Sequence, residues 1–370
     1  MAIMIEQGLP TPSTSARYST LRPTVERLGR TVEGILRELL EGQGIEFLSI
    51  TSRAKTLESF SGKQQRKKYD DPLRDMTDLC GVRVVTYLRS DVARVDGLVR
   101  SAFLIDPAHS VDKGGQLPVD RVGYRSVHLV CSLGPERTSL GEYIAFGDLR
   151  FELQIRTALE HAWAQVEHGR KYKFGGVLPS ELQRRLHVAA GALELLDGEL
   201  DRIAAEVDAY AQNVIEKTRE GDLAIEINTT SLRAYLQVRA GLLRNMQYIP
   251  VEHDASWNML LDELRRFGVT TLAEVDQLFT DEFIMLRDRY HYPDVRTNEI
   301  GITRDALMFA DIEKFFETSF QHRWSELDRG TYDMLVERYG AAKVDSILSS
   351  NDVRVVSDAE WLDNLRQDEA

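Results

Sequence analysis

The chain has 370 residues, 43% of them hydrophobic and 28% charged, and its 46 Lys and Arg against 59 Asp and Glu give a formal net charge of −13. This length predicts two domains, or one domain with a large appendage, and the composition excludes a disordered or fibrous chain. The chain carries no secretory signal, only two cysteines, and no apolar run of the ~18 residues that a membrane helix needs, so we expect a cytoplasmic protein without disulfides.

The first half of the chain alternates between helical and strand patterns. The predicted elements are a helix over residues 18–40, a strand over 45–51, a helix over 56–69, a strand over 81–88, a helix over 91–103, a loop over 113–123, and strands over 124–133 and 148–157. Helices interleaved with strands in this order predict an α+β fold, in which a mixed β-sheet packs against helices.

From residue 158 onward the pattern is helical. Apolar residues recur at helical spacing over residues 158–172, 180–220, 231–246, 256–267, 272–290, 304–320 and 331–348. The predicted organisation is therefore a flexible tail over residues 1–17, an α+β domain over 18–200 and an all-α region over 201–370.

The negative charge belongs to the all-α region. Residues 1–200 hold 27 basic and 26 acidic residues, a net of +1, whereas residues 201–370 hold 19 and 33, a net of −14. Within residues 53–89, nine basic residues stand against five acidic ones. A basic segment on an acidic protein indicates a local anion site. For the run over residues 63–68 taken alone, a solvated helix face is the simpler interpretation.

Four polar clusters lie on the predicted strands or at their ends. They are R-A-K-T-L-E-S-F-S-G-K from Arg53, D-L-C-G-V-R from Asp78, G-Y-R-S-V-H from Gly123 and E-L-Q-I-R-T from Glu152. Each cluster alone has a structural interpretation, such as an ion pair or the cap of a turn. Polar strand faces are costly to bury without a partner or a ligand. Four such clusters within about 105 residues therefore favour a binding or catalytic site.

The residue types in these clusters fit two nucleotides and a metal ion. Asp78 and Glu152, on separate strands, are the kind of ligand that Mg²⁺ prefers beside phosphate oxygens. Lysine and arginine neutralise polyphosphates, and arginine also lies flat on purine rings. The basic candidates are Arg53, Lys55, Lys63 and Arg83, and Tyr124 can stack on a second base. The pattern predicts phosphoryl or pyrophosphoryl transfer.

These motifs resemble, in order and spacing, the synthetase domain of RelA/SpoT-type alarmone synthetases. The shared series is R-x-K, S, K, then D-x-x-G-x-R-V, G-Y-R-S-x-H, E-x-Q-I-R-T and H-A-W-A-x-x-E-H, within residues 45–173. The resemblance implies a nucleotidyltransferase-like synthetase domain. It also implies a Mg²⁺-dependent enzyme that moves pyrophosphate from ATP to the ribose 3′-hydroxyl of GDP or GTP, giving ppGpp or pppGpp.

The resemblance further implies a role for each site residue. Those implied at ATP are Arg53 and Arg83, which sandwich the adenine, and Lys55, Ser59 and Lys63, which contact the phosphates. Those implied at the acceptor nucleotide are Tyr124, which stacks on guanine, His128, and His161 at the guanine edge. Those implied at the metal and the attacking oxygen are Asp78, Glu152 and Gln154. Whether Glu152 acts as the base or only as a metal ligand stays open.

The chain departs from the family pattern in one loop. Many members have Pro-Lys shortly before the Gly-Tyr pair, whereas this chain has P-V-D-R-V from Pro118. Arg121 and Lys113 are the candidates to replace that lysine at the phosphates of the acceptor. About 45 residues precede the motifs, so we expect a stand-alone synthetase without the hydrolase domain of bifunctional members.

Two other functions stay open. Some small relatives in this family pyrophosphorylate the 3′ end of tRNA, and the basic run over residues 63–68 is the kind of patch that docks an acceptor stem. The acidic all-α region would then neutralise the site in cis; otherwise it serves oligomerisation or regulation. A non-catalytic nucleotide sensor is the third interpretation, although the two carboxylates and Tyr124 are intact. We expect a homo-oligomer and no membrane partner.

Overall fold

The computed structural model describes residues 13–112, 126–173, 179–239, 247–248, 254–290 and 296–357. Its contacts divide the chain into two compact units, Met1–Ala204 and Ala205–Ala370, which we call the sheet unit and the helical unit. Among the described residues, no helix combines the length and the apolar character needed to cross a membrane.

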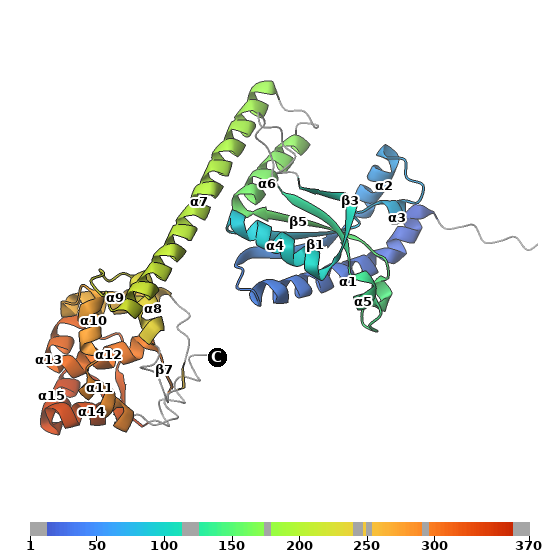
Figure 1. The fold of residues 1–370 in the computed structure, drawn as a ribbon. Coiled ribbons are helices and arrows are strands. Elements are labelled where there is room, and N and C mark those ends of the chain that lie inside the picture. The colour runs from blue at the N-terminus through green and yellow to red at the C-terminus, as the bar shows by residue number, and fades with distance from the viewer. Residues whose placement is uncertain are drawn as a thin grey trace, which may run out of the picture. The chain divides into compact units, whose positions relative to one another are not determined.

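A five-stranded sheet forms the centre of the sheet unit (Figure 1). Its strands are β1 (Phe47–Ala54), β2 (Cys80–Thr86), β3 (Leu104–Asp112), β4 (Val127–Ser132) and β5 (Phe151–Thr157). They lie side by side in the order β1-β2-β5-β4-β3, and the β2–β5 pair is parallel while the other pairs are antiparallel. The predicted mixed sheet is confirmed, and β5 occupies its centre.

Helices cover the apolar face of this sheet and follow its last strand. The helical segments of the sheet unit are α1 (Thr14–Glu41), α2 (Leu57–Arg66), α3 (Pro72–Asp75), α4 (Arg89–Ala102), α5 (Gly134–Thr138), η1 (Ile144–Phe146), α6 (Ala158–Lys173) and α7 (Ser180–Glu220), of which α7 continues into the helical unit. Leu28 and Leu36 of α1 and Val95 of α4 are fully buried in one core with Val84 and Leu153 of the sheet. Helix α1 begins at Thr14, four residues before the predicted start.

Strand β3 was not expected from the sequence. It contains Pro107, which cannot donate a ladder hydrogen bond, and its pairing with β4 is irregular between Asp106 and Val111. The hydroxyl of Ser110 accepts from the amide of Val130 at 3.0 Å, so a side chain replaces part of the ladder. An edge position tolerates both features, which is why a pattern without alternation still forms a strand here.

Helix α1 approaches β1 closely at Gly29. A Cβ atom at Gly29 would lie 2.5 Å from the Ser52 Oγ, whereas one at Gly34 meets nothing within 4 Å. We therefore expect Gly29→Ala to lower the free energy of unfolding by about 1–3 kcal/mol through overpacking. The exposed Gly34→Ala, on the same helix, is expected to raise it by about 0.5–1 kcal/mol because alanine favours helix. Urea denaturation of both variants measures the difference, and equal stabilities would contradict this packing.

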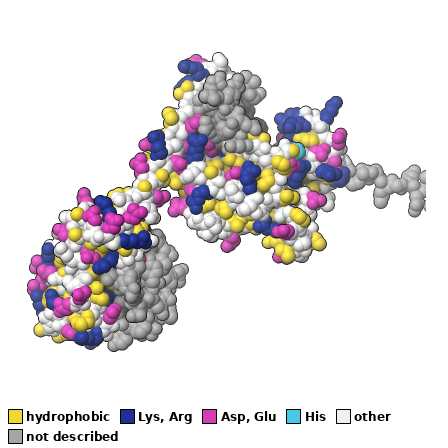
Figure 2. Space-filling view, in the orientation of Figure 1, with side chains coloured by type: hydrophobic (Ala, Val, Ile, Leu, Met, Phe, Trp, Pro, Cys, Tyr) yellow, Lys and Arg dark blue, Asp and Glu magenta, His cyan; other side chains and the backbone are white. Residues whose placement is uncertain are grey.

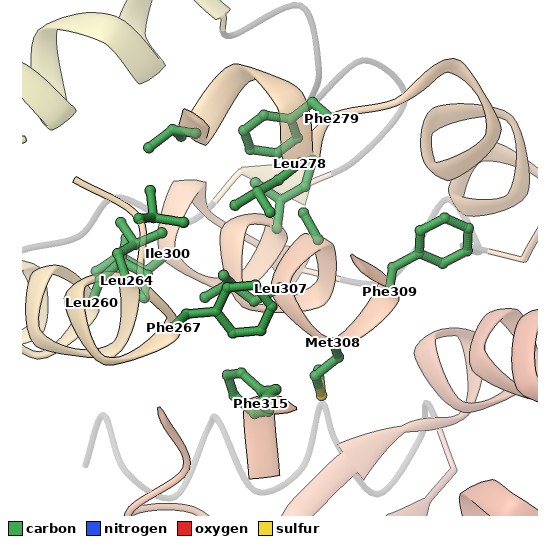
Figure 3. Packing of buried hydrophobic residues seen from close by; sticks show 14 of the residues in the cluster. Leu260, Leu264, Phe267, Leu278, Phe279, Ile300, Leu307, Met308, Phe309 and Phe315 are labelled. Atoms are coloured by element: carbon green, nitrogen blue, oxygen red, sulfur yellow. The ribbon is translucent and has the colours of Figure 1, made fainter. Parts of the chain in front are cut away.

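The helical unit consists of short helices around an aromatic core. Its elements are α8 (Thr229–Val238), β6 (Gln247–Tyr248), α9 (Asp254–Phe267), α10 (Leu272–Leu278), α11 (Asp281–Tyr290), β7 (Arg296–Thr297), α12 (Glu299–Ala310), α13 (Ile312–Lys314), a π-helical turn η3 (Phe315–Ser319), β8 (Glu326–Asp328), α14 (Arg329–Tyr339), α15 (Ala341–Ser350) and β9 (Arg354–Val356). Figure 3 shows Phe267, Leu307 and Phe315 in this core. The region is helical as predicted, with two short parallel strand pairs, β6–β7 and β8–β9, added.

Candidate active site

Polar side chains from four strands share the sheet face opposite α1. The pairing register aligns two rows across the sheet: Thr51, Arg83, Gln154 and His128 in one, and Arg53, Gly81 and Glu152 in the other. Because strand side chains alternate between faces, residues aligned in these rows project on the same side. Glu152 and Gln154, two positions apart on β5, therefore lie on this one face.

A cleft of about 260 Å³ opens on this face between β1, β2, β5 and the start of α2. Its lining includes most of the residues predicted at ATP, at the metal and at the attacking oxygen: Arg53, Lys55, Ser59, Asp78, Arg83, Glu152 and Gln154. Three predicted acceptor-side residues, Lys113, Arg121 and Tyr124, lie outside the described residues. The structure thus brings together seven predicted residues that span about 100 positions of the chain.

Asp78 lies two residues before the start of β2, between two lysines. Its Oδ2 is 2.8 Å from the Nζ atoms of both Lys55 and Lys63, which brings the predicted Lys63 to the edge of the cleft. Burial alone would raise the pKa of Asp78, but the two ammonium groups hold it below its ordinary value. The carboxylate therefore stays ionised at neutral pH. Its Oδ1 is buried and has no hydrogen-bond partner among the residues that the structure describes.

Glu152 is held by its neighbours on β4 and β5. His128 Nδ1 lies 2.8 Å from Glu152 Oε1, and the side-chain amide of Gln154 donates to the same oxygen at 3.2 Å. The hydrogen bond from His128 lowers the pKa of Glu152 more than burial raises it. His128 is expected at the acceptor nucleotide from the sequence, and the structure adds that it orients a carboxylate in the cleft.

His161 lies one turn into α6, directly after β5. Burial lowers the pKa of His161, and the positive charges of Arg156 and Arg83 lower it further, so its imidazole is neutral at pH 7. Its Nδ1 is buried without a hydrogen-bond partner in the described part of the chain. It does not line the cleft described above, although the positive charge of Arg83, which does line it, acts on the ionisation of His161.

Local structure fixes the start of α2, which carries the phosphate-site candidates. Thr56 caps the helix by accepting from the amide of Ser59 at 3.1 Å. The hydroxyl of Tyr18 on α1 donates to the carbonyl of Lys55 at 2.7 Å, and its ring stacks on Phe60 at 4.4 Å. The backbone at Lys55 is thus tied to α1 before any ligand binds.

Among the lining residues, sequence reasoning missed two with hydroxyl side chains, Thr51 and Thr56; Ser52 also lines the cleft, but its Oγ lies beside Gly29 of α1. Thr51 stands two positions before Arg53, so strand alternation would have placed it on the same face. Thr56 carried no comparable signal, because a hydroxyl just after a strand is common in any turn.

The oxygen ligands available in the cleft fit a divalent cation of the Mg²⁺ type. Two carboxylates, Asp78 and Glu152, line one small cleft, and the charge of Asp78 acts on the ionisation of Glu152. The buried Oδ1 of Asp78 offers a lone pair that nothing else described takes. Mg²⁺ needs only one or two carboxylates when phosphate oxygens complete its shell. The described residues hold no group of three or more His, Cys, Asp or Glu that could bind a metal without such a ligand.

Comparisons with known proteins point to one family. Residues 52–177 match the region found in RelA/SpoT proteins. The GTP pyrophosphokinase YjbM of Bacillus subtilis (strain 168) is 33% identical over 210 residues, which cover 54% of this chain and 92% of that protein. The GTP pyrophosphokinase YwaC of the same organism is 31% identical over 161 residues, which cover 42% of this chain and 73% of that protein.

A solved structure gives a similar match. The small alarmone synthetase 1 from Bacillus subtilis is 26% identical, with a TM-score of 0.43, over 52% of this chain and 98% of that chain. The motif series, the cleft that it forms and the match to nearly the whole length of one pyrophosphokinase agree. This chain belongs to the RelA/SpoT family of pyrophosphokinases.

Proposed function

We propose that this protein transfers the pyrophosphate group of ATP to the ribose 3′-hydroxyl of GDP or GTP, forming ppGpp or pppGpp. One observation carries the proposal: two carboxylates, one lysine and two arginines from β1, β2, β5 and the turns beside them line a single cleft, and Lys63 of α2 contacts the carboxylate of Asp78 at its edge. Arg and Lys neutralise phosphates, while carboxylates suit a metal and a hydroxyl.

The reaction forms one bond and breaks one bond. The 3′-oxygen of the acceptor bonds to the β-phosphorus of ATP, the bond from that phosphorus to the α–β bridging oxygen breaks, and AMP leaves with the bridging oxygen. The hydroxyl proton is released to solvent, so that ATP and the acceptor yield AMP, the pyrophosphorylated nucleotide and one proton. Charge neutralisation and alignment supply most of the rate in such transfers.

The donor-side residues have distinct tasks. Arg53 on β1 and Arg83 on β2 line the cleft and offer guanidinium planes for the adenine. Lys55 and Lys63 already bracket one carboxylate, so a bound triphosphate would share the two ammonium groups with Asp78. The capped start of α2 adds the Ser59 hydroxyl and the positive end of the helix dipole, which favour phosphate.

Glu152 is the proposed contact for the attacking hydroxyl. Its lowered pKa keeps it ionised, so it can accept a hydrogen bond from the 3′-hydroxyl. His128 and Gln154 fix its rotamer, which limits the acceptor oxygen to one direction of approach. For the acceptor base and its phosphates we retain Tyr124, Lys113, Arg121 and His161 as proposed contacts.

Mg²⁺ is the proposed cofactor, with Asp78 and Glu152 as its protein ligands. Bound there, it would withdraw charge from the phosphate oxygens and so make the phosphorus more electrophilic. Asp78 contributes a charge already held by two lysines, and Glu152 contributes a carboxylate oriented by His128.

A tRNA acceptor is the second candidate, and one observation favours it. Lys67 and Lys68 are exposed at the end of α2, and basic side chains gather around this helix on the face shown in Figure 2. Exposed lysines beside a phosphate-transfer cleft are suited to the backbone of a nucleic acid.

An acceptor panel separates the two candidates. Full-length protein is incubated with γ-labelled ATP and Mg²⁺, and with GDP, GTP or deacylated tRNA as acceptor. We expect label in the guanine nucleotides only, resolved by thin-layer chromatography. Label in tRNA and not in GDP or GTP would replace the first proposal by the second, and nucleotide binding without labelled product would support a sensor.

A further inference from the structure

A buried tyrosine near the start of α1 contacts the turn that carries Lys55. The side chain of Tyr18 is fully buried, and its hydroxyl donates to the carbonyl of Lys55 at 2.7 Å. Burial raises the pKa of Tyr18 to about 12, so the hydroxyl keeps its proton and remains a donor at neutral pH. A phenol placed in a core needs such a partner, whereas phenylalanine would fill the same space without one.

The backbone of Lys55 is held from two directions. Lys55 lies after the last ladder pair of β1 and before the first residue of α2, so a donor for its carbonyl must come from elsewhere. Its amide donates to the carbonyl of Leu79 at 2.8 Å, and its own carbonyl accepts from Tyr18. Because Leu79 directly follows Asp78, the first of these bonds also fixes the backbone of Lys55 beside that of Asp78. The hydroxyl of Tyr18 thus completes the hydrogen bonding of this turn.

The ring of Tyr18 is fixed by its own packing. It stacks on Phe60 of α2 with a centroid distance of 4.4 Å and an interplanar angle of 14°, and Phe60 is fully buried as well. A second contact joins the same two helices, because the Oγ atoms of Ser15 and Ser61 lie 3.3 Å apart. Helix α2 accordingly lies beside the start of α1 (Figure 1). With its ring held in one orientation, the hydroxyl of Tyr18 is directed at one acceptor, the carbonyl of Lys55.

The side chain of Lys55 lies where the phosphates of ATP are proposed to bind. It lines the cleft, and its Nζ is 2.8 Å from Asp78 Oδ2. A lysine side chain is flexible and loses conformational entropy when a ligand fixes it, so a backbone that is already fixed lowers the remaining cost. Tyr18 does not line the cleft and is fully buried, so it has no surface with which to contact ATP itself. Its hydrogen bond to the Lys55 backbone is the direct route by which it acts on the cleft.

We propose that Tyr18 is a positioning residue for ATP, whose hydroxyl holds the backbone of Lys55 so that the ammonium group meets the phosphates. The inference rests on the proposed function only in taking ATP as the donor, and it does not depend on whether the acceptor is a guanine nucleotide or tRNA. Without the hydroxyl, the carbonyl of Lys55 loses its donor and the turn is free to shift, which lowers the affinity for the phosphates.

Tyr18→Phe isolates the hydroxyl. Phenylalanine retains the stack on Phe60, and only the hydrogen bond to Lys55 is lost. Isothermal titration calorimetry of the full-length protein with a non-hydrolysable ATP analogue and Mg²⁺ measures the effect. We expect Tyr18→Phe to bind the analogue about 10-fold more weakly than the wild type, because leaving a buried acceptor without its donor costs a factor of this order. Circular dichroism checks that each variant is folded.

Tyr235→Phe is the matched control. Tyr235 is also fully buried, and its hydroxyl donates to Asp276 Oδ1 at 2.6 Å, but it belongs to the helical unit. Removal of this hydroxyl also leaves a buried hydrogen bond unmade, so it lowers stability by the same mechanism. We expect its affinity for the analogue to stay within about twofold of the wild type, which separates positioning of Lys55 from a general loss of stability.

Lys55→Met tests whether Tyr18 acts through Lys55. Methionine keeps an unbranched side chain but removes the charge, and we expect it to weaken binding of the analogue at least ~10-fold. If the hydroxyl of Tyr18 acts by placing that charge, Tyr18→Phe has nothing further to remove in this background. The double variant is therefore expected to bind within about twofold of Lys55→Met alone.

The outcomes separate this inference from the proposed function. Equal affinity of Tyr18→Phe and the wild type, an equal loss in Tyr235→Phe, or a further loss of about 10-fold in the double variant would each overturn the positioning role of Tyr18 while ATP remained the donor. A folded wild type that does not bind the analogue, or Lys55→Met that binds it as tightly as the wild type, would instead contradict the proposed donor site and this inference with it.

Discussion

Asp78→Asn is expected to lower kcat for pyrophosphate transfer by about 10³-fold or more while the protein remains folded. Asparagine preserves the shape of the side chain but removes the charge that Lys55 and Lys63 contact at 2.8 Å. It also replaces one of the two proposed metal ligands by a neutral group. Initial rates with labelled ATP and the preferred acceptor measure the loss, and circular dichroism measures the fold.

Asp106→Asn is the matched control for this variant. Asp106 belongs to the same unit and forms an ion pair with Arg150 at 2.9 Å, but it does not line the cleft. We expect this variant to keep turnover within a few-fold of the wild type. Wild-type turnover in Asp78→Asn, or an equal loss in Asp106→Asn, would contradict the assigned role of Asp78.

Glu152→Gln is expected to reduce kcat by a similar factor without weakening the binding of ATP by more than a few-fold. The amide still accepts the hydrogen bond from His128, so the geometry seen at 2.8 Å can persist. What disappears is the negative charge, which the hydrogen bond from His128 stabilises by lowering the pKa of the carboxyl group. The loss should therefore appear in kcat and not in binding.

Two measurements separate these effects for Glu152→Gln. Calorimetry with a non-hydrolysable ATP analogue reports donor binding, and single-turnover rates report the chemical step. Strong loss of ATP binding with an unchanged single-turnover rate would place Glu152 in the donor site and remove it from the attacking oxygen.

Much of the sheet could be predicted because its central strands have strong local patterns. Strand β2 is an apolar, β-branched run and β5 alternates apolar with polar residues, and both strands are buried except at Gly81, Arg83, Glu152 and Gln154. Strand β3 could not be predicted, because Pro107 and its polar neighbours carry no alternation and only the sheet edge makes them a strand.

Helix ends in the helical unit were harder to locate than the helices. Residues 272–290 read as one periodic stretch, but α10 ends at Leu278 and the hydroxyl of Thr280 caps α11 by accepting from Phe283 at 3.1 Å. Residues 331–348 are divided at Gly340, whose φ of +86° ends α14. Both breaks depend on side-chain caps and on backbone conformations that hydrophobic periodicity does not report.

The composition of the cleft could be predicted in part, but its internal contacts could not. Motif order indicated that Asp78 and Glu152 belong to one site, and the cleft contains both. That His128 holds Glu152 depends on the register of β4 against β5, which pairs His128 with Gln154. A register is a property of two strands together, so neither motif alone contains it.

The identity of the transferred group is the central claim, and the adenine product reports it most directly. Pyrophosphate transfer converts ATP to AMP, whereas transfer of a single phosphoryl group would leave ADP. Full-length protein with ATP, Mg²⁺ and GDP or GTP should therefore produce AMP in one-to-one ratio with a guanosine nucleotide that gains two phosphates, measured by ion-exchange chromatography and mass spectrometry. ADP with a singly phosphorylated product, or AMP formed without any guanosine product, would contradict it.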